Sequence, residues 1–213
     1  MGRFALFDFD STLTSKDTTR YLLFELIRLR PWKSVHLFGL IAARACAPSS
    51  EFQFAKNRCI GACLKGLTQE RIEIVCARFH NRVRRLLLPS VLERARECRE
   101  AGVQVVVVTA SPEFAIAPLF KCEGFLCVGT LYSRVGAVYD GALAGPPCYA
   151  EQKVSALLAR CLSAESEIVE AWSDSISDLP MMALAEKRFW VCEGRDWKRI
   201  KEIDPDGIQF SRF

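Results

Sequence analysis

The sequence predicts an α/β protein with a parallel sheet covered by helices on both faces and a small helical segment inserted after the first strand. From residue 89 to 192, short apolar runs alternate with helical patterns, which is typical of a parallel sheet. Between residues 17 and 88, apolar residues instead recur at helical spacing. We therefore expect a core domain formed by residues 1–16 and 89–213 and a helical cap formed by residues 17–88.

The first predicted strand is the apolar run from Phe4 to Phe9, which ends in a cluster of polar residues. A buried strand that leads into a functional loop has this pattern. The helical segment that follows has predicted breaks at Pro31, at Pro48 and at the turn of residues 66–68.

The second half of the chain continues the parallel sheet. Pro89 begins a predicted helix that stops at Gly102, and the valine-rich run of residues 103–108 is typical of a central strand. Ser111 is a good N-cap with Pro112 as first helical residue, so a helix should begin where this strand ends. The other predicted elements are a strand at residues 125–130, a hairpin at 135–143 with its turn at Asp140–Gly141, a helix at 151–162, a strand at 168–172, a helix at 177–185 and a last strand at 189–192. Together they indicate a Rossmann-like fold.

Charge is distributed unevenly along the chain. The net charge is +4, but residues 15–88 hold 14 Lys/Arg against 5 Asp/Glu. This basic segment is either a solvated helical surface or a surface that attracts an anionic substrate or membrane. It contains no aromatic stacking motif, so we do not expect nucleic-acid binding.

The cellular setting is predicted from two absences. The ten cysteines form no Cys-x-x-Cys pair and no secretory signal precedes the first strand, which favours buried thiols in a reducing cytoplasm. The uncharged stretch of residues 34–43 is about half of the roughly 20 residues that a spanning helix needs. We expect a soluble cytoplasmic protein, with peripheral membrane contact through the basic cap as the alternative.

Asp8 and Asp10 are the first candidates for chemistry. They lie two residues apart at the end of a strand, where the pleat would point both carboxylates the same way. Two like charges at close range are relieved by protonation of one or by a cation between them. Loop carboxylates after a strand are also common, so this pair needs support from other parts of the chain.

Three later pieces provide that support. A hydroxyl and free N–H groups at residues 109–111 could form a phosphate cradle, although plain helix capping would use the same residues. Lys153 lies near the start of a helix, where most lysines are surface residues. Asp174 and Asp178 suit a hard cation, or equally a doubled N-cap. In this order the pieces supply what phosphoryl transfer needs.

The segments DFDSTLT and VVVVTAS, followed by Lys153 and SDSISD, resemble the four motifs of the haloacid dehalogenase (HAD) superfamily. Within it, the chain is most similar to the phosphoserine-phosphatase-like subfamily IB, which has a helical cap after the first motif. The stretches SPEFAIAPLF, GPPCYAEQK and SDSISDLPM resemble a wider group that includes phosphatidylglycerophosphate phosphatases.

The resemblance implies a role for each candidate residue. Asp8 would be the nucleophile that becomes an aspartyl-phosphate, and Asp10 the acid and base, whose backbone carbonyl would also bind Mg2+. Asp174 would complete the metal site. The other implied roles are phosphate binding by Thr109, Ala110, Ser111 and Lys153, support by Thr12, Ser177 and Asp178, and contact with the substrate amine by Asp17.

Two departures from that subfamily affect the substrate. Thr109-Ala110-Ser111 stands where phosphoserine phosphatases have Ser-Gly-Gly, and Ser177 stands where they have Asn. The expected function is magnesium-dependent hydrolysis of a small phosphorylated metabolite such as phosphoserine. The alternatives are a phosphatase of a phospholipid head group at the membrane surface, a phosphotransferase and a non-catalytic phosphate-binding regulatory module.

Overall fold

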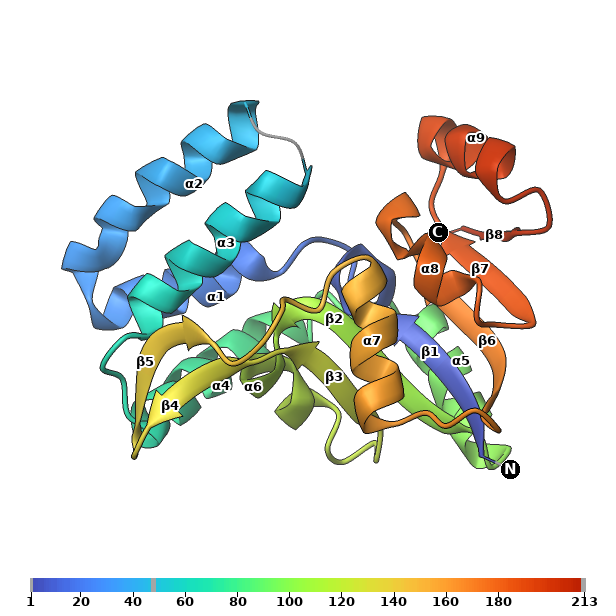
Figure 1. The fold of residues 1–213 in the computed structure, drawn as a ribbon, viewed down its shortest axis with the longest axis horizontal. Helices are drawn as coiled ribbons and strands as arrows, with labels where there is room; N and C mark the ends of the chain where they lie inside the picture. Colours follow the sequence, from blue (N-terminus) through green and yellow to red (C-terminus); the bar gives the residue numbers. More distant parts are fainter. Residues whose placement is uncertain (1, 47–48, 212–213) are drawn as a thin grey trace. The chain divides into compact units, whose positions relative to one another are not determined.

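The structure is a computed structural model that describes residues 2–46 and 49–211, without the side chains of residues 42–50. Pro48, a predicted helix break, lies outside the described residues. The chain forms two compact units, one of residues 1–17, 85–129 and 148–213 and the other of residues 18–84 and 130–147 (Figure 1). Each is described by itself.

The first unit, here called the sheet unit, contains a six-stranded sheet in the order β3-β2-β1-β6-β7-β8. The pairings of β1 with β2 and β6, and of β7 with β6 and β8, are parallel. The predicted α/β fold class is thereby confirmed. The strands are β1 (Arg3–Asp8), β2 (Gln104–Pro112), β3 (Leu126–Thr130), β6 (Glu167–Ser173), β7 (Lys187–Val191) and β8 (Ile208–Phe210).

Side chains on both faces of the central strands are buried. Leu6 and Val106 belong to one apolar cluster, while Ala5 and Phe7, which alternate with Leu6 along β1, are also fully buried. Helix α5 (Pro89–Glu100) and helix α7 (Glu151–Arg160) cover opposite faces (Figure 1). Burial on both faces explains why these strands are continuous apolar runs in the sequence.

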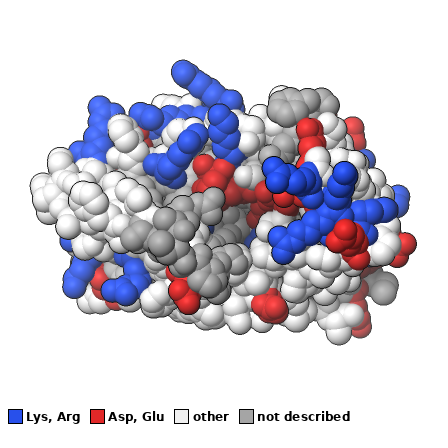
Figure 2. All heavy atoms as spheres, turned by 90° about the horizontal axis from the view of Figure 1, so that it is seen from above, with Lys and Arg blue, Asp and Glu red and all other residues white. Residues whose placement is uncertain are grey.

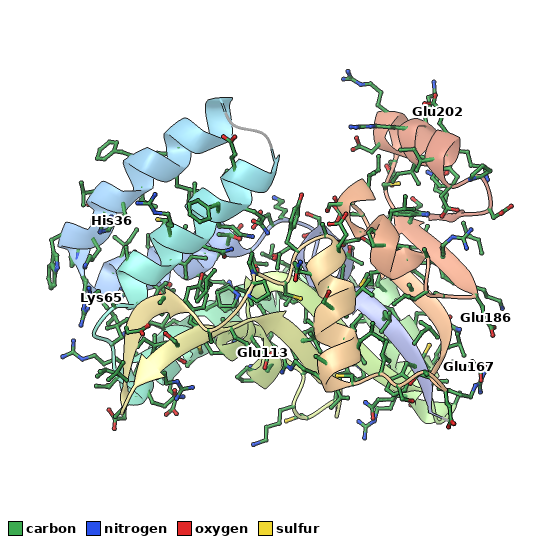
Figure 3. All side chains as sticks on the ribbon, viewed as in Figure 1. His36, Lys65, Glu113, Glu167, Glu186 and Glu202 are labelled. Atoms are coloured by element: carbon green, nitrogen blue, oxygen red, sulfur yellow. The ribbon has the colours of Figure 1, made fainter. Side chains whose placement is uncertain are left out.

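A helix does begin directly where this strand ends, as predicted, but Ser111 is not its N-cap and Pro112 is not its first helical residue. Strand β2 continues to Pro112, and the short helix α6 (Glu113–Ile116) begins after it, followed by the 3-10 turn η3 (Ala117–Leu119). Pro112 has an extended backbone, with ψ of 125°. The Ser111 hydroxyl donates to Asp10 instead of capping a helix. Glu113, labelled in Figure 3, is held in place by the Gly129 N–H and the Arg160 guanidinium.

The C-terminal part of the sheet unit differs from prediction in two places. The helix expected over residues 177–185 is a 3-10 turn, η4 (Ile176–Asp178), followed by the short helix α8 (Leu179–Met182). Strand β7 is not the last strand, because helix α9 (Gly194–Ile203) leads to β8. The three-residue edge strand β8 has no apolar run long enough to predict it.

In the second unit, here called the helical unit, the described residues form four helices and one hairpin. Its elements are α1 (Thr19–Leu29), the 3-10 turn η2 (Pro31–Ser34), α2 (Val35–Cys46), α3 (Ser49–Leu64), α4 (Gln69–Val83), β4 (Tyr132–Val135) and β5 (Val138–Leu143). A Cβ atom on Gly61 of α3 would lie 2.1 Å from the carbonyl oxygen of Gly141, so β5 and α3 approach closely at these two glycines. The Tyr132 hydroxyl also donates to the Asn57 carbonyl.

The hairpin turn is not where the sequence indicated. The chain reverses between β4 and β5 at Gly136, which has a φ of +60°, whereas Asp140 and Gly141 lie within β5. The Asp140 carboxylate accepts hydrogen bonds from the Ser133 hydroxyl and the Ala142 N–H. Gly136 and Gly141 are both glycines that could form a turn. Gly136 does so, whereas Gly141 lies where β5 approaches α3 closely.

The described residues contain free cysteines and no candidate membrane-spanning helix. The cysteines whose side chains are described are free thiols, most of them buried. Within residues 2–46 and 49–211, no helix combines the length and the hydropathy that crossing a bilayer requires.

Candidate active site

The candidate residues of the sheet unit converge at the carboxyl ends of β1, β2 and β6. Strand β1 lies between the other two, and Asp8, its last residue, is in register with Val108. Parallel strands deliver their carboxyl ends to one edge of the sheet, where ligands bind in folds of this class. Asp8, Thr109 and Asp174 are therefore brought together by strand topology.

Lys153 connects two of the carboxylates. Its ammonium donates to Asp8 Oδ1 at 2.6 Å and to Asp178 Oδ2 at 2.7 Å, and all three side chains are buried. Burial alone would lower the pKa of Lys153, but the carboxylates of Asp178 and Asp8 outweigh it and raise the pKa. The lysine is therefore a fixed positive charge inside the site.

The surroundings of Asp8 hold more negative charge than one lysine can balance. Burial raises the pKa of Asp8 to about 8, and Asp178 and Asp174 add to the rise against the opposing effect of Lys153. The Thr12 hydroxyl lies 3.2 Å from Asp8 Oδ2 and 3.4 Å from Asp174 Oδ1. Several carboxylates thus surround one cation in a site of low dielectric.

Asp10 is positioned by a loop rather than by a strand pleat. Strand β1 ends at Asp8, and residues Phe9–Leu13 (η1) form an irregular turn in which Ser11 has a φ of +63°. Thr14 closes this turn through its N–H and hydroxyl, which both donate to the Phe9 carbonyl. Asp10 Oδ2 accepts a 2.6 Å hydrogen bond from the Ser111 hydroxyl. The β1 loop and the end of β2 are thereby joined.

The other predicted residues take less central positions. The Thr109 hydroxyl is buried and accepts the N–H of Ser111, and Ala110 is partly buried between them. The Ser177 hydroxyl lies 2.9 Å from the Ser175 hydroxyl. Asp17 is exposed in the segment that follows the η1 loop, and its contact with a substrate amine stays a prediction.

One residue of this network was not predicted. The Ser173 hydroxyl donates to Asp178 Oδ2 at 2.7 Å and accepts the N–H of Ser175 at 3.1 Å. It is fully buried at the last position of β6. A hydroxyl at the end of a buried strand, just before a candidate carboxylate, is the signal by which it could have been found.

The donor atoms of this site fit a hard divalent cation. Carboxylate oxygens are the ligands that Mg²⁺ prefers, and the excess of negative charge around Asp8 is what a cation would relieve. The side chains described here do not, however, form a preassembled cluster of three or more His, Cys, Asp or Glu ligands. Backbone carbonyl and water oxygens commonly complete a magnesium site that has one or two carboxylates.

The fold and the site define a class of α/β protein with an acidic centre at the carboxyl edge of its sheet. A sequence profile of haloacid dehalogenase-like hydrolases matches residues 5–183, and the chain belongs to this family. The Caulobacter vibrioides protein named CicA is 30% identical over 200 residues, which cover 89% of this chain and 86% of that protein. A Mycobacterium tuberculosis protein named "probable phosphatase" is 30% identical over 84% of this chain and 64% of its own length.

Solved structures share the fold. A Bordetella pertussis protein of unknown function superposes with a TM-score of 0.79 and 21% identity, covering all of both chains. A substrate-bound phosphoserine phosphatase has a TM-score of 0.62 and 16% identity, covering 99% of this chain and 93% of its own. At these identities the likeness shows the fold, including the helical insertion after β1, and does not extend to the substrate.

Proposed function

We propose that the protein is a magnesium-dependent phosphomonoester hydrolase that works through an aspartyl-phosphate on Asp8. The observation that carries this proposal is the buried bridge from Lys153 to Asp8 and Asp178 at the carboxyl edge of the sheet. It holds a carboxylate nucleophile beside a permanent cation, at the place where an incoming phosphate would also be neutralised. The name of the Mycobacterium tuberculosis relative agrees with a phosphatase activity.

The reaction has two balanced steps. An oxygen of Asp8 attacks phosphorus while the ester P–O bond breaks, and Asp10 gives its proton to the departing alkoxide. Asp10 then takes a proton from water, whose oxygen attacks phosphorus and breaks the bond to Asp8, so that inorganic phosphate leaves and Asp8 is restored. The hydrogen bond from Ser111 keeps Asp10 oriented for both proton transfers.

Asp8 and Asp174, with the backbone carbonyl of Asp10, would hold the magnesium ion, which neutralises phosphoryl oxygens when bound. Lys153 holds Asp8 in position and balances part of the charge, and Asp178 and Ser173 fix the lysine. We assign phosphoryl binding to residues 109–111 and a supporting role to Thr12, which contacts both Asp8 and Asp174.

The proposed substrate is a small phosphorylated metabolite, with phosphoserine as the first compound to test. A phospholipid head group is the second candidate, because the segment of η2 and α2 exposes large apolar side chains and η2 contains Lys33. A screen of both classes with magnesium separates them by the ratio of their kcat/KM values.

The decisive experiment measures phosphate release from an aryl phosphate with and without magnesium. We expect release only with magnesium, and a loss of at least about 10⁴-fold in Asp8→Asn, which removes the nucleophile. Asp206→Asn, at a carboxylate whose side chain is 92% exposed, is the matched control and should keep full activity.

Other outcomes of this experiment would contradict the proposal in distinct ways. Full activity of Asp8→Asn would disprove the aspartyl-phosphate. Tight binding of inorganic phosphate by wild-type protein without turnover of any ester would favour the regulatory module. Transfer of phosphate to an added alcohol in place of water would identify a phosphotransferase.

A further inference from the structure

The segment of η2 and α2 exposes several large apolar side chains to solvent. Four large side chains at a spacing of three residues are exposed, namely Trp32 (69%), Val35 (59%), Phe38 (74%) and Ile41 (64%). We call these four side chains the apolar stripe. Such a row of exposed large side chains is unusual for a surface that only meets water, and it indicates an interaction site.

Apart from Glu25, the charged residues between positions 18 and 41 are Lys and Arg. Glu25 is the one carboxylate in the sequence between residues 18 and 50. Its side chain is 1% exposed and pairs with Arg82 at 3.2 Å and Arg28 at 3.9 Å. Arg28 and Lys33 flank Trp32 in the sequence, and the Arg28 side chain is 57% exposed. The surface therefore presents cations without an exposed carboxylate among the described side chains of residues 18–41.

Figure 2 shows the same pattern over the elements involved. The side of the molecule that holds α1–α3 carries a broad uncharged area, with Lys and Arg groups and fewer Asp and Glu groups at its margin. His36 of α2, labelled in Figure 3, is only partly exposed. Helix α2 packs against α3. The Arg30 guanidinium, which donates to the carbonyls of Lys65 and Gly66, ties η2 to the end of α3.

We propose that the apolar stripe docks the protein on the surface of a bilayer that contains anionic lipids. Tryptophan and phenylalanine enter the boundary between head groups and acyl chains, while lysine and arginine contact lipid phosphates. A second copy of this chain is the competing occupant, but a symmetric pair would bring the same cations against each other. The proposal concerns an interaction surface and does not depend on the reaction.

The test is co-sedimentation of the full chain with vesicles of phosphatidylcholine alone or mixed with phosphatidylglycerol. We expect binding to the mixed vesicles, weakened by salt, and little binding to phosphatidylcholine. Lys33→Gln should weaken binding about fivefold, because one cation near an anionic surface contributes about that factor. The double variant Trp32→Ser/Phe38→Ser should weaken it by at least about tenfold.

Matched controls keep the result specific to this surface. Val135→Ser removes an equally exposed apolar side chain (67%) from the hairpin, and Lys121→Gln removes an exposed cation from the sheet unit. Both should bind as wild type does. Trp32→Phe should keep binding but lose most of the blue shift of tryptophan fluorescence that lipid insertion produces.

Three results would overturn the proposal. One is no binding to mixed vesicles by a folded wild-type protein, and another is equal losses in the stripe variants and the controls. The third is a dimer in sedimentation analysis that Phe38→Ser dissociates, with no vesicle binding, which would assign the stripe to a second copy. Hydrolysis of a soluble aryl phosphate by all these variants should match wild type, so failure here is distinct from failure of the proposed reaction.

Discussion

Two clusters around buried carboxylates, one at the ends of β1 and β6 and one on β6 and α5, differ in how their charge is balanced. At the carboxyl end, Lys153 bridges Asp8 and Asp178, with Asp174 close by. Deeper in the sheet, Glu170 is 2% exposed and accepts hydrogen bonds from Arg94, the Cys98 thiol and the Trp172 indole.

This difference in charge balance distinguishes a functional site from a structural cluster. Glu170 has one cation and two neutral donors, so its charge is fully satisfied. Burial would raise its pKa, but the hydrogen bonds from these three donors outweigh burial and lower it. Asp8 shares one lysine with a second carboxylate, and burial raises its pKa to about 8. A satisfied cluster stabilises the fold, whereas an unbalanced one has capacity for a further cation or for chemistry.

Among the variants that test this comparison of the two clusters, Lys153→Met should have the largest effect. It leaves Asp8 and Asp178 buried without a cation, which costs about 3–5 kcal/mol of unfolding free energy. Phosphate release should fall about 10³-fold, because a charge that faces the developing phosphoryl group is lost. Urea denaturation and aryl phosphate hydrolysis measure the two losses. Lys187→Met, at an exposed lysine of β7, should change neither.

Glu170→Ala should separate stability from catalysis. It leaves Arg94 without its buried partner and the Trp172 indole without an acceptor, and we expect a loss of about 3 kcal/mol in unfolding free energy. At a temperature where the variant stays folded, kcat should match wild type. A large fall in kcat of the folded variant would show that the two clusters are coupled.

Much of this comparison could be predicted from the sequence. The apolar runs of residues 4–9 and 168–172 predicted two of the strands, β1 and β6, and parallel topology brings their carboxyl ends together. The Glu170 cluster could not be predicted, because a strand glutamate, a helix arginine and a cysteine carry no local pattern. Their contact exists only when α5 packs on the sheet.

Hydroxyl roles were the least predictable part of the site. Ser111 has the sequence context of an N-cap, yet its hydroxyl bonds Asp10, a residue 101 positions earlier in the chain. Ser173 likewise has its role through Asp178, five residues later. A hydroxyl rotates toward the best nearby acceptor, so its partner depends on tertiary structure rather than on the residues beside it.

Acid should weaken the Glu170 cluster in a defined way. Because the pKa of Glu170 lies below the ordinary value of roughly 4.3, its stabilising contribution is present above that pH and is lost as pH falls through the folded-state pKa. Wild-type unfolding free energy should therefore fall more steeply below about pH 4 than that of Glu170→Gln, which has no carboxyl to protonate. Parallel curves in urea denaturation across this range would contradict the assignment.

Among the variants expected to slow the reaction, Ser111→Ala should have the smallest effect. The Ser111 hydroxyl donates to Asp10 at 2.6 Å, and a hydrogen bond to a charged group contributes about 1.5 kcal/mol, so Ser111→Ala should lower kcat about tenfold. Ser177→Ala removes a hydroxyl that pairs with Ser175 and should change kcat by less than about twofold. Steady-state kinetics on one aryl phosphate compares the two variants. A larger loss in Ser177→Ala than in Ser111→Ala would contradict this assignment. It would show that the loop after β6, rather than Ser111, orients Asp10, and the unbalanced cluster would then include Ser177.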